Sequence, residues 1–584
     1  MGKSFEQLFA EIQAKKKAQL AAAPVPPVPF VPPVPVVERR ILDTGQLTMA
    51  PLMPAAWANA LEHQIQAALP MPGAIQLDEH QLRFIELAST HNVPNEPIIL
   101  IGAAGTGKTT TVGKLIERIF ETEPLHPVSW AHKYLPMKSA GIVVCSFTRR
   151  ATANIRKRLP QDLQGNCITI HKLLEFEPDY IEVWDQKLGM MKSTMRFLPK
   201  RNQYNKLEYG LKYLIVEEYS MLGTQLWSQL KAALPEGVRI IFVGDIYQLP
   251  PVMDTPAVAP YLCVSPTVEL QTVYRTALDN PIIKYATDIR NGRGFSVPDT
   301  LILKAPDGIG SLTLKPWKAS AAEEIVIAQL GKFFRAEYLS GAYDPDDAQI
   351  LIPWNKRLGS IELNKWIATA IAQKNQRPVY EVIAGFEKQY FAIGDRCIWD
   401  KNDCEILEIK RNPAFLGNVP QDESLFLDYW GHLNGVPRPA HESAIDEVEF
   451  LLGNAIASDV EDGERVKQAS HRILIRLTDT GEEITLKSAG DVNLLDLSYA
   501  MTIHKAQGSE WRKVYLCFHK IHATTLNREL LYTGFTRAKE ELYVICEKDT
   551  FVKGVKQQAI KGVTLEQKAE TLRLKAKLAA KGIR

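Results

Sequence analysis

The segment from Gly102 to Thr109, GAAGTGKT, has the residue types and spacing that bind a polyphosphate. It matches the pattern G-x-x-x-x-G-K-[ST] in full, between the apolar run IILI and the helical segment TTVGKLIERIF. In this strand–loop–helix context, backbone N–H groups and the positive end of the helix attract phosphate oxygens. We therefore predict a nucleotide site in which Lys108 binds the β- and γ-phosphates and the Thr109 hydroxyl binds Mg²⁺. The residues predicted to form it are Gly102, Ala104, Gly105, Thr106, Gly107, Lys108, Thr109 and Thr110.

Two carboxylates, Glu217 and Glu218, directly follow the apolar run YLIV. A phosphate site of this kind needs one carboxylate to hold the metal and a second to polarise the attacking water. We assign Glu217 to the metal and Glu218 to the water. A purely structural acid pair is the alternative, but the position at the end of a buried strand favours the catalytic role.

The surrounding chain has an α/β pattern from Gln76 onward. Short apolar runs alternate with helical segments, as they do where parallel strands are buried on both faces. One set comprises IILIGAAG, GIVVCSF, YLIVEEYS and RIIFVGD, and a later set comprises QILIPWN, KVYLCFH and LYVICE. Within the later set, between QILIPWN and KVYLCFH, residues 395–490 are rich in short strand patterns. This indicates a small barrel inserted into a second α/β domain.

The composition excludes several classes of protein. The chain has 584 residues, and its net charge of +2 predicts that any nucleic-acid surface is a local patch. Seven cysteines without metal-site spacing argue against a disulfide scaffold or a zinc site and favour a reducing compartment. The longest uncharged apolar run, Ala21–Val37, carries seven prolines and cannot span a membrane as a helix. We expect a cytoplasmic protein that makes no membrane contact.

Further segments follow in a characteristic order: LDEHQ ending at Gln81, SFTRRA (146–151), ITIH (168–171), VGDIYQLPPV (243–252), TVYRT (272–276), MTIHKAQGSEW (501–511) and LLYTGFTRAKEEL (530–542). This set resembles the motifs of superfamily 1 DNA helicases over roughly residues 76–550. The G-D-x-x-Q-L-P-P-V form is similar to the 5′→3′ branch, the RecD-like and phage Dda-like enzymes. The family usually has Asp-Glu where this chain has Glu217-Glu218, a variant that keeps the chemistry.

The resemblance implies an α/β fold with two RecA-like parallel-sheet domains, a β-hairpin pin insert and a small SH3-like β-barrel insert. The predicted domains are a first ATPase domain (71–275) with the pin insert at about 175–210, a second domain in two parts (276–395 and 491–550) and the SH3-like insert (396–490). Outside the resemblance, the composition predicts a disordered Pro-rich tail with a short helix (1–70) and a basic C-terminal helix or tail (551–584).

The resemblance also assigns roles around the nucleotide. Gln81 would bind adenine, and Gln248 would sense the γ-phosphate. Arg275 and Arg537 would be arginine fingers, because a fixed guanidinium stabilises the charge of the transition state. Gly508 and Glu510 would line the nucleotide side of the same cleft. ATP and Mg²⁺ are the implied cofactors.

A basic segment, residues 146–160, carries five Lys or Arg and no acid directly after a buried strand. Hydroxyl and guanidinium groups there suit single-strand phosphates; a solvated helix face is the alternative. From this segment and the family motifs, the predicted nucleic-acid contacts are Thr148, Arg149, His171, Trp354, Asn355, Thr502 and His504.

The insertion at 175–210 contains two alternating runs around a Lys-Leu-Gly turn, which predicts a β-hairpin. The family has a strand-separating pin in this place. Trp184 and Phe197 are the candidates for stacking on a base at the fork, and packing beneath the hairpin as ordinary core is the alternative.

The sequence thus predicts an ATP-dependent DNA helicase that moves 5′→3′ on single-stranded DNA and unwinds duplex and fork DNA, in replication, recombination or repair. The alternatives are a single-strand translocase that displaces proteins, and an ATP-gated single-strand loading factor. We expect a monomer. The N-terminal tail resembles a docking peptide for a replication or single-strand-binding protein, and a frayed tail without a partner is the alternative. The C-terminal tail, with nine Lys or Arg against two Glu over 551–584, would add DNA affinity or form a solvated helix.

Overall fold

The computed structural model describes residues 76–580 except 91–95, 124, 186–189, 274–278, 294–300, 307–309, 317–322, 386, 401, 416–467 and 479–480. The predicted N-terminal tail and Arg275 lie outside the described residues, and so do the side chains of residues 178–196, including Trp184. Residues Gln76–Arg584 form one compact unit. No helix in the described part of the chain combines the length and the hydropathy needed to cross a bilayer.

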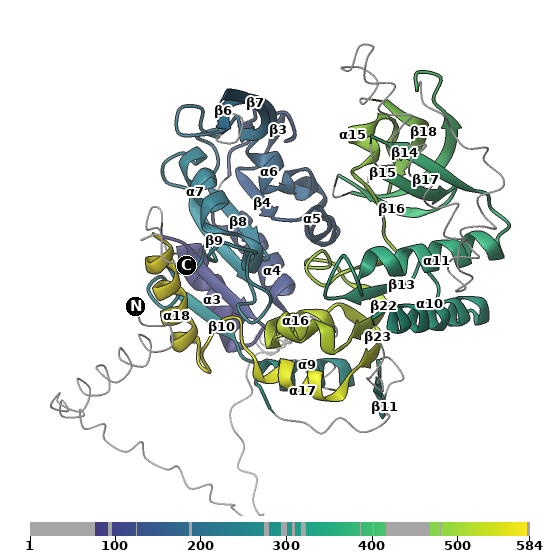
Figure 1. Cartoon of the computed structure of the whole chain (residues 1–584). Coiled ribbons are helices and arrows are strands. Elements are labelled where there is room, and N and C mark those ends of the chain that lie inside the picture. Colours follow the sequence, from purple (N-terminus) through teal and green to yellow (C-terminus); the bar gives the residue numbers. More distant parts are fainter. Residues whose placement is uncertain are drawn as a thin grey trace, which may run out of the picture. The chain divides into compact units, whose positions relative to one another are not determined.

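The first parallel sheet carries the predicted phosphate loop. Its strands are β1 (Ile98–Gly102), β4 (Ile142–Ser146), β5 (Cys167–Thr169), β8 (Tyr213–Glu217), β9 (Arg239–Gly244) and β10 (Thr267–Leu270). They follow the order β10-β1-β9-β8-β4-β5, and every neighbouring pair is parallel. All residues of β1, β4 and β8 are buried, because helices cover both faces of these apolar strands. The helices of this domain are α3 (Glu79–Thr90), α4 (Lys108–Thr122), α5 (Arg149–Arg156), α6 (Ile170–Leu173) and α7 (Thr224–Ala233) (Figure 1).

The second sheet carries the later motifs. Its strands are β11 (Leu301–Lys304), β12 (Ser311–Pro316), β13 (Ala348–Ile352), β21 (Ala500–Thr502), β22 (Trp511–Phe518) and β23 (Ala538–Cys546), in the order β11-β12-β23-β22-β13-β21. Only the edge strand β11 is antiparallel to its neighbour. The accompanying helices are α9 (Pro281–Arg290), α10 (Glu323–Ser340), α11 (Ser360–Lys374), α16 (Arg528–Phe535) and α17 (Lys548–Lys556). Two parallel α/β domains are therefore present, as the sequence predicts.

A third, antiparallel sheet interrupts the second domain. Its strands are β14 (Val379–Ala384), β15 (Glu387–Ala392), β16 (Arg396–Trp399), β17 (Asn402–Arg411), β18 (Gln468–Leu477), β19 (Glu483–Ser488) and β20 (Leu495–Leu497), with the short helix α15 (Ala489–Val492) packed on it. The sheet is wider than the predicted insert of 396–490, because β14 and β15 form an antiparallel pair before it and β20 pairs with β16 after it.

A two-stranded hairpin leaves the first domain between α6 and β8. It consists of β6 (Phe176–Asp185) and β7 (Met190–Pro199), which pair in register from Phe176–Pro199 to Asp185–Met190. Figure 1 shows this hairpin near α6 and β3 (Lys138–Ser139). Strand β3 pairs with β2 (Val128–Ser129). Phe197 is 60% exposed, so this side chain does not pack as core.

The C-terminal helix α18 (Leu565–Ala580) packs on the first domain. Its Ala569 and Leu572 are buried in the same apolar cluster as strands of the first sheet. Lys568 forms a 3.4 Å ion pair with Glu529 of α16, and both side chains are 1% exposed. The alternative of a solvated helix is therefore wrong for this segment: its apolar stripe is covered, and at least one of its lysines is committed to an internal pair.

Candidate nucleotide and nucleic-acid sites

The phosphate loop has the backbone that its glycines predict. Gly105 and Gly107 both have φ of +79°, a conformation that side chains with a Cβ rarely adopt. A Cβ at Gly102 would lie 2.5 Å from Thr106 Oγ1, so only glycine fits there. Gly107 offers no side chain to cap α4, which leaves the N–H groups at the start of this helix available to an anion. Lys108 Nζ donates to the carbonyls of Gly102 (2.8 Å) and Ala103 (3.1 Å).

Gln81, the predicted adenine-binding residue, lies against this loop. Its side chain is buried and its Nε2 donates to the Thr106 carbonyl at 3.5 Å. The Oε1 atom accepts the N–H of Asp78, and Asp78 Oδ1 accepts the N–H of Gln81. This reciprocal pair fixes the start of α3 beside the loop.

Glu217 and Glu218 end β8 at the carboxyl edge of the first sheet. Glu217 is 6% exposed, and burial together with the charge of Glu218 raises the pKa of Glu217 to about 8, against the opposing charges of Lys108 and Arg158. Glu217 Oε1 and Glu218 Oε2 are buried without a hydrogen-bond partner. Glu218 has φ of +54°, a strained backbone of the kind that gathers at functional sites. Unpartnered carboxylate oxygens in a buried site beside a lysine fit a hard divalent cation such as Mg²⁺.

The segment after β9 lies between the two parallel-sheet domains. Gln248 is buried, and its Oε1 has no hydrogen-bond partner. The next residue, Leu249, accepts from Gln507 Nε2 at 3.0 Å and donates its N–H to Thr533 Oγ1 at 3.1 Å. The predicted γ-phosphate sensor is thus adjacent to a residue held by both later motifs.

The sequence analysis did not assign a role to two residues near the phosphate loop, Tyr532 and Asp245. Tyr532 of α16 donates its hydroxyl proton to Asp245 Oδ2 at 2.6 Å and accepts the N–H of Ala104 at 3.1 Å. Both residues lie inside motifs quoted above, and this position was the one sign in the sequence that they could act at the site. Nothing in the spacing indicated that the tyrosine reaches the phosphate loop.

Arg537 does not reach the phosphate loop in this structure. Its guanidinium donates to the carbonyls of Thr533 (3.0 Å) and Ser509 (3.1 Å) and to Thr536 Oγ1 (3.0 Å), all within the second domain. The side chain is buried beside α16. The guanidinium of Arg537 is therefore held within the second domain. It lies a short distance along the chain from Tyr532, which does contact the loop.

Gly508 and Glu510 connect the second domain to α5. A Cβ at Gly508, where φ is +77°, would lie 2.6 Å from Ala151 Cβ, and the Gly508 carbonyl accepts from Asn154 at 3.2 Å. Glu510 lies 3.9 Å from Arg158, whose Nη1 donates to Thr109 Oγ1 at 3.1 Å. Arg158 thereby joins Glu510 to the predicted metal-binding hydroxyl, which agrees with a place on the nucleotide side.

The basic segment at α5 is engaged by the antiparallel insert. Thr148 caps α5 by accepting the N–H of Ala151 at 3.2 Å. Arg149 donates to Asn402 Oδ1 and lies 3.6 Å from Asp400. Arg150 binds both carboxylate oxygens of Asp403. Asp400 before β17 and the first two residues of β17, Asn402 and Asp403, thus present oxygen atoms to the arginine pair, as a phosphate backbone would.

The remaining predicted nucleic-acid residues lie at the carboxyl ends of strands in both parallel sheets. His171 follows β5 and packs against the rings of Phe147 and Phe176, with centroids 5.6 and 5.1 Å away. Trp354 follows β13 and donates Nε1–H to Thr525 at 2.5 Å. Thr502 ends the adjacent β21, and burial lowers the pKa of His504.

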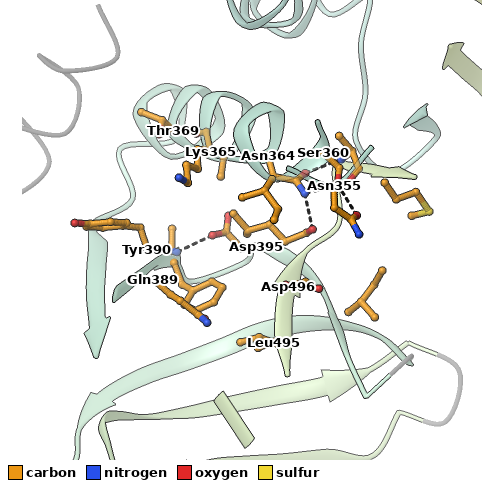
Figure 2. A pocket seen from close by; sticks show the side chains of 18 of the residues that line it. Asn355, Ser360, Asn364, Lys365, Thr369, Gln389, Tyr390, Asp395, Leu495 and Asp496 are labelled. Atoms are coloured by element: carbon orange, nitrogen blue, oxygen red, sulfur yellow. Dashed lines mark hydrogen bonds between the residues drawn. The ribbon is translucent and has the colours of Figure 1, made fainter. Parts of the chain in front are cut away.

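Asn355 faces a cavity of about 380 Å³ between α11 and the insert. Figure 2 shows Asn364, Lys365 and Asp395 around this cavity, with Asp496 across from the helix. Asn355 Oδ1 accepts from Ser360 at 3.2 Å. The cavity is lined by both charged and apolar groups and adjoins the predicted nucleic-acid residues of the second domain.

Comparison with known proteins shows which families this chain resembles. Residues 86–254 match the family described as an AAA domain, and residues 497–545 match the UvrD-like helicase C-terminal domain. The ATP-dependent RecD2 DNA helicase of Deinococcus radiodurans is 25% identical over 487 residues, which are 82% of this chain and 50% of that protein. By these matches the chain is similar to the RecD-like helicases of superfamily 1. The RecBCD enzyme subunit RecD of Buchnera aphidicola subsp. Schizaphis graminum is 22% identical over 510 residues, 82% of this RecD-like chain and 74% of that subunit.

The RecD-like chain therefore spans half the length of the Deinococcus protein and about three quarters of the Buchnera subunit. Among solved structures, Pif1 helicase from Candida albicans is 14% identical, with 86% of this chain and 100% of that chain covered. The TM-score between the two structures is 0.37.

Proposed function

We propose that this RecD-like helicase hydrolyses ATP with Mg²⁺ and uses the reaction to move 5′→3′ on single-stranded DNA and to unwind duplex DNA. The observation that carries the proposal is the buried, unpartnered carboxylate oxygens of Glu217 and Glu218. They lie near enough to Lys108 for its charge to oppose the raised pKa of Glu217. The 5′→3′ direction is supported by the sequence resemblance.

Each site residue would have a separate role in ATP binding or hydrolysis. Thr109 and Glu217 would hold Mg²⁺, which supplies positive charge to the phosphates when bound. Glu218 would orient and polarise the attacking water, since its Oε2 has no other partner in the site. Gln81 would recognise adenine from its place against the loop, and the free Oε1 of Gln248 would respond to the γ-phosphate.

Arg537 would act as an arginine finger after exchanging its bonds to carbonyls of its own domain for bonds to phosphate. The carbonyl oxygens that now accept from Arg537 are neutral. A phosphate is charged and therefore binds a guanidinium group more strongly. The exchange requires the two domains to close on the nucleotide, which couples hydrolysis to movement. Arg275 is proposed as the second finger on the resemblance alone.

Single-stranded DNA would follow the carboxyl ends of both parallel sheets. The proposed contacts are Thr148, Arg149, His171, Trp354, Asn355, Thr502 and His504. The strand would compete with Asp400 and Asp403 for the arginine pair of α5, since both offer oxygen ligands to the same guanidinium groups. On the resemblance we further propose that the antiparallel insert is SH3-like and that the protein acts as a monomer in the cytoplasm, in replication, recombination or repair.

Unwinding of tailed duplexes tests the function. With ATP and Mg²⁺, we expect separation of a duplex that carries a 5′ single-stranded tail and little separation of the same duplex with a 3′ tail. Unwinding only from the 3′ tail would refute the polarity. Hydrolysis with protein displacement but no strand separation would favour a translocase, and ATP-dependent binding without turnover would favour a loading factor.

The hairpin β6–β7 is proposed to act as the pin. A base-pair step costs about 1.4 kcal/mol to open, and an aromatic side chain that stacks on the exposed base offsets part of this cost. We expect that replacing residues 177–198 with a short Gly-Ser turn abolishes unwinding from the 5′ tail while DNA-stimulated ATP turnover stays within about twofold of wild type. Phe176 is retained in this variant because it packs against His171 and the domain core.

Phe197→Ala is the matched point variant, because its ring is exposed and its loss leaves the hairpin backbone in place. A partial loss of unwinding is expected from it. If the Gly-Ser variant loses ATP turnover as severely as unwinding, the hairpin supports the motor fold and is not a pin.

A further inference from the structure

Tyr532 forms a direct link between the second domain and the phosphate loop. Its side chain is 1% exposed. The single hydroxyl group makes two bonds of opposite sense: it donates to Asp245 Oδ2 at 2.6 Å and accepts the N–H of Ala104 at 3.1 Å. A phenol has one proton to donate and so fits this pair of partners, whereas phenylalanine would leave a buried carboxylate oxygen and a loop amide without this partner.

The partners of Tyr532 are themselves fixed. Asp245 is fully buried, and its Oδ1 accepts the N–H of Tyr247 at 3.0 Å. Arg290 lies over the Tyr247 ring at 3.9 Å and binds Glu269 at 2.9 Å. Burial, followed by the charge of Asp245, raises the pKa of Tyr532 well above its ordinary value, so the hydroxyl keeps its proton at neutral pH. The hydroxyl therefore has a defined direction, toward Asp245.

The same helix carries the link onward to Arg537. Thr533, the neighbour of Tyr532 on α16, accepts the N–H of Leu249 on its Oγ1 at 3.1 Å. Its carbonyl accepts from Arg537 Nε at 3.0 Å. A movement of Tyr532 away from Ala104 would shift Thr533 and with it the carbonyl that holds the arginine.

We propose that Tyr532 is a positioning residue that transmits the state of the phosphate loop to Arg537. The proposal rests on the ATP hydrolysis proposed above. The Ala104 N–H has one proton and is now bound to Tyr532, so a phosphate oxygen that takes this amide releases the tyrosine. The release shifts α16, and the carbonyl bonds that hold Arg537 are loosened at the moment when nucleotide is present.

Tyr532→Phe tests this role, because it keeps the ring and its burial and removes only the hydroxyl. We expect the DNA-stimulated kcat to fall about tenfold, the scale of a lost hydrogen bond to a charged group. The KM for ATP should change by less than about twofold, because a positioning residue acts on the turnover step. A defect confined to KM would overturn the proposal.

Tyr515→Phe is the matched control. Tyr515 is equally buried in the second domain, but its hydroxyl bonds to Glu337 (3.0 Å) and the Ala342 carbonyl (3.1 Å), all within that domain. Equal losses of kcat in the two variants would show a general effect of a disturbed core and would overturn the proposal. A normal kcat in Tyr532→Phe would do the same.

Hydrogen–deuterium exchange separates this inference from the proposed function. In nucleotide-free protein, the peptide that contains Ala104 should exchange faster in Tyr532→Phe than in wild type or Tyr515→Phe, whether or not the protein hydrolyses ATP. Unchanged exchange would overturn the link. A wild-type protein without ATP turnover would refute the proposed function, and exchange at the loop would then decide the contact by itself.

Discussion

Lys108→Ala is expected to lower DNA-stimulated ATP turnover by at least about 10²-fold, to near the limit of detection. Lys108 begins α4, and its Nζ donates to two loop carbonyls, those of Gly102 and Ala103. Because both partners are neutral carbonyls, the ammonium group can leave them and bind the β- and γ-phosphates. Because the ammonium group does not support the apolar core, the midpoint of thermal unfolding should stay close to that of wild type.

Lys114→Ala supplies the control for this substitution. Lys114 lies on the same helix and pairs with Glu117 at 2.6 Å, at an exposed position. Its removal should leave ATP turnover unchanged, since exposed pairs of this kind contribute little. Appreciable turnover in Lys108→Ala, measured with single-stranded DNA and Mg²⁺ present, would contradict the assignment of the phosphate loop.

Glu218→Gln is expected to bind ATP and Mg²⁺ normally and to hydrolyse ATP at least about 10²-fold more slowly, the scale of general-base catalysis. An amide has nearly the shape of the carboxylate but cannot accept the proton of the attacking water. Glu217→Gln should instead weaken the Mg²⁺ dependence of nucleotide binding, because Glu217 is the proposed metal ligand. ATP turnover and Mg²⁺-dependent binding of a fluorescent ATP analogue distinguish the two variants.

The reverse pattern would exchange the two roles. If Glu217→Gln lost hydrolysis and kept Mg²⁺-dependent binding while Glu218→Gln behaved oppositely, Glu217 would be the group that polarises water. Equal and complete loss of nucleotide binding in both variants would mean that the pair holds the metal jointly.

Much of the proposed nucleotide site could be located from the sequence, because its residues are neighbours there. The phosphate loop and the Glu217-Glu218 pair each follow a single apolar strand, so a local pattern places them at the carboxyl edge of the sheet. Gln81 lies near the start of α3, 25 residues before Thr106, and its contact with Thr106 needed the resemblance to be anticipated.

Contacts between distant segments were not predictable in this way. Tyr532 and Ala104 lie 428 residues apart in the sequence, and Arg149 and Asn402 lie 253 apart. No periodicity carries such information, because side-chain partners across a domain boundary depend on how two sheets pack. The basic composition of α18 likewise concealed an apolar stripe at Leu565, Ala569 and Leu572, whose helical spacing was the signal to follow.

We propose that nucleic acid held across both parallel-sheet domains drives closure of the nucleotide site. The most direct test is the rate of ATP turnover by the full chain as single-stranded DNA is titrated in, with Lys108→Ala as the blank. We predict a low rate without DNA that rises with the DNA concentration and saturates. A full rate in the absence of any nucleic acid, or a rate that DNA leaves unchanged, would contradict this coupling.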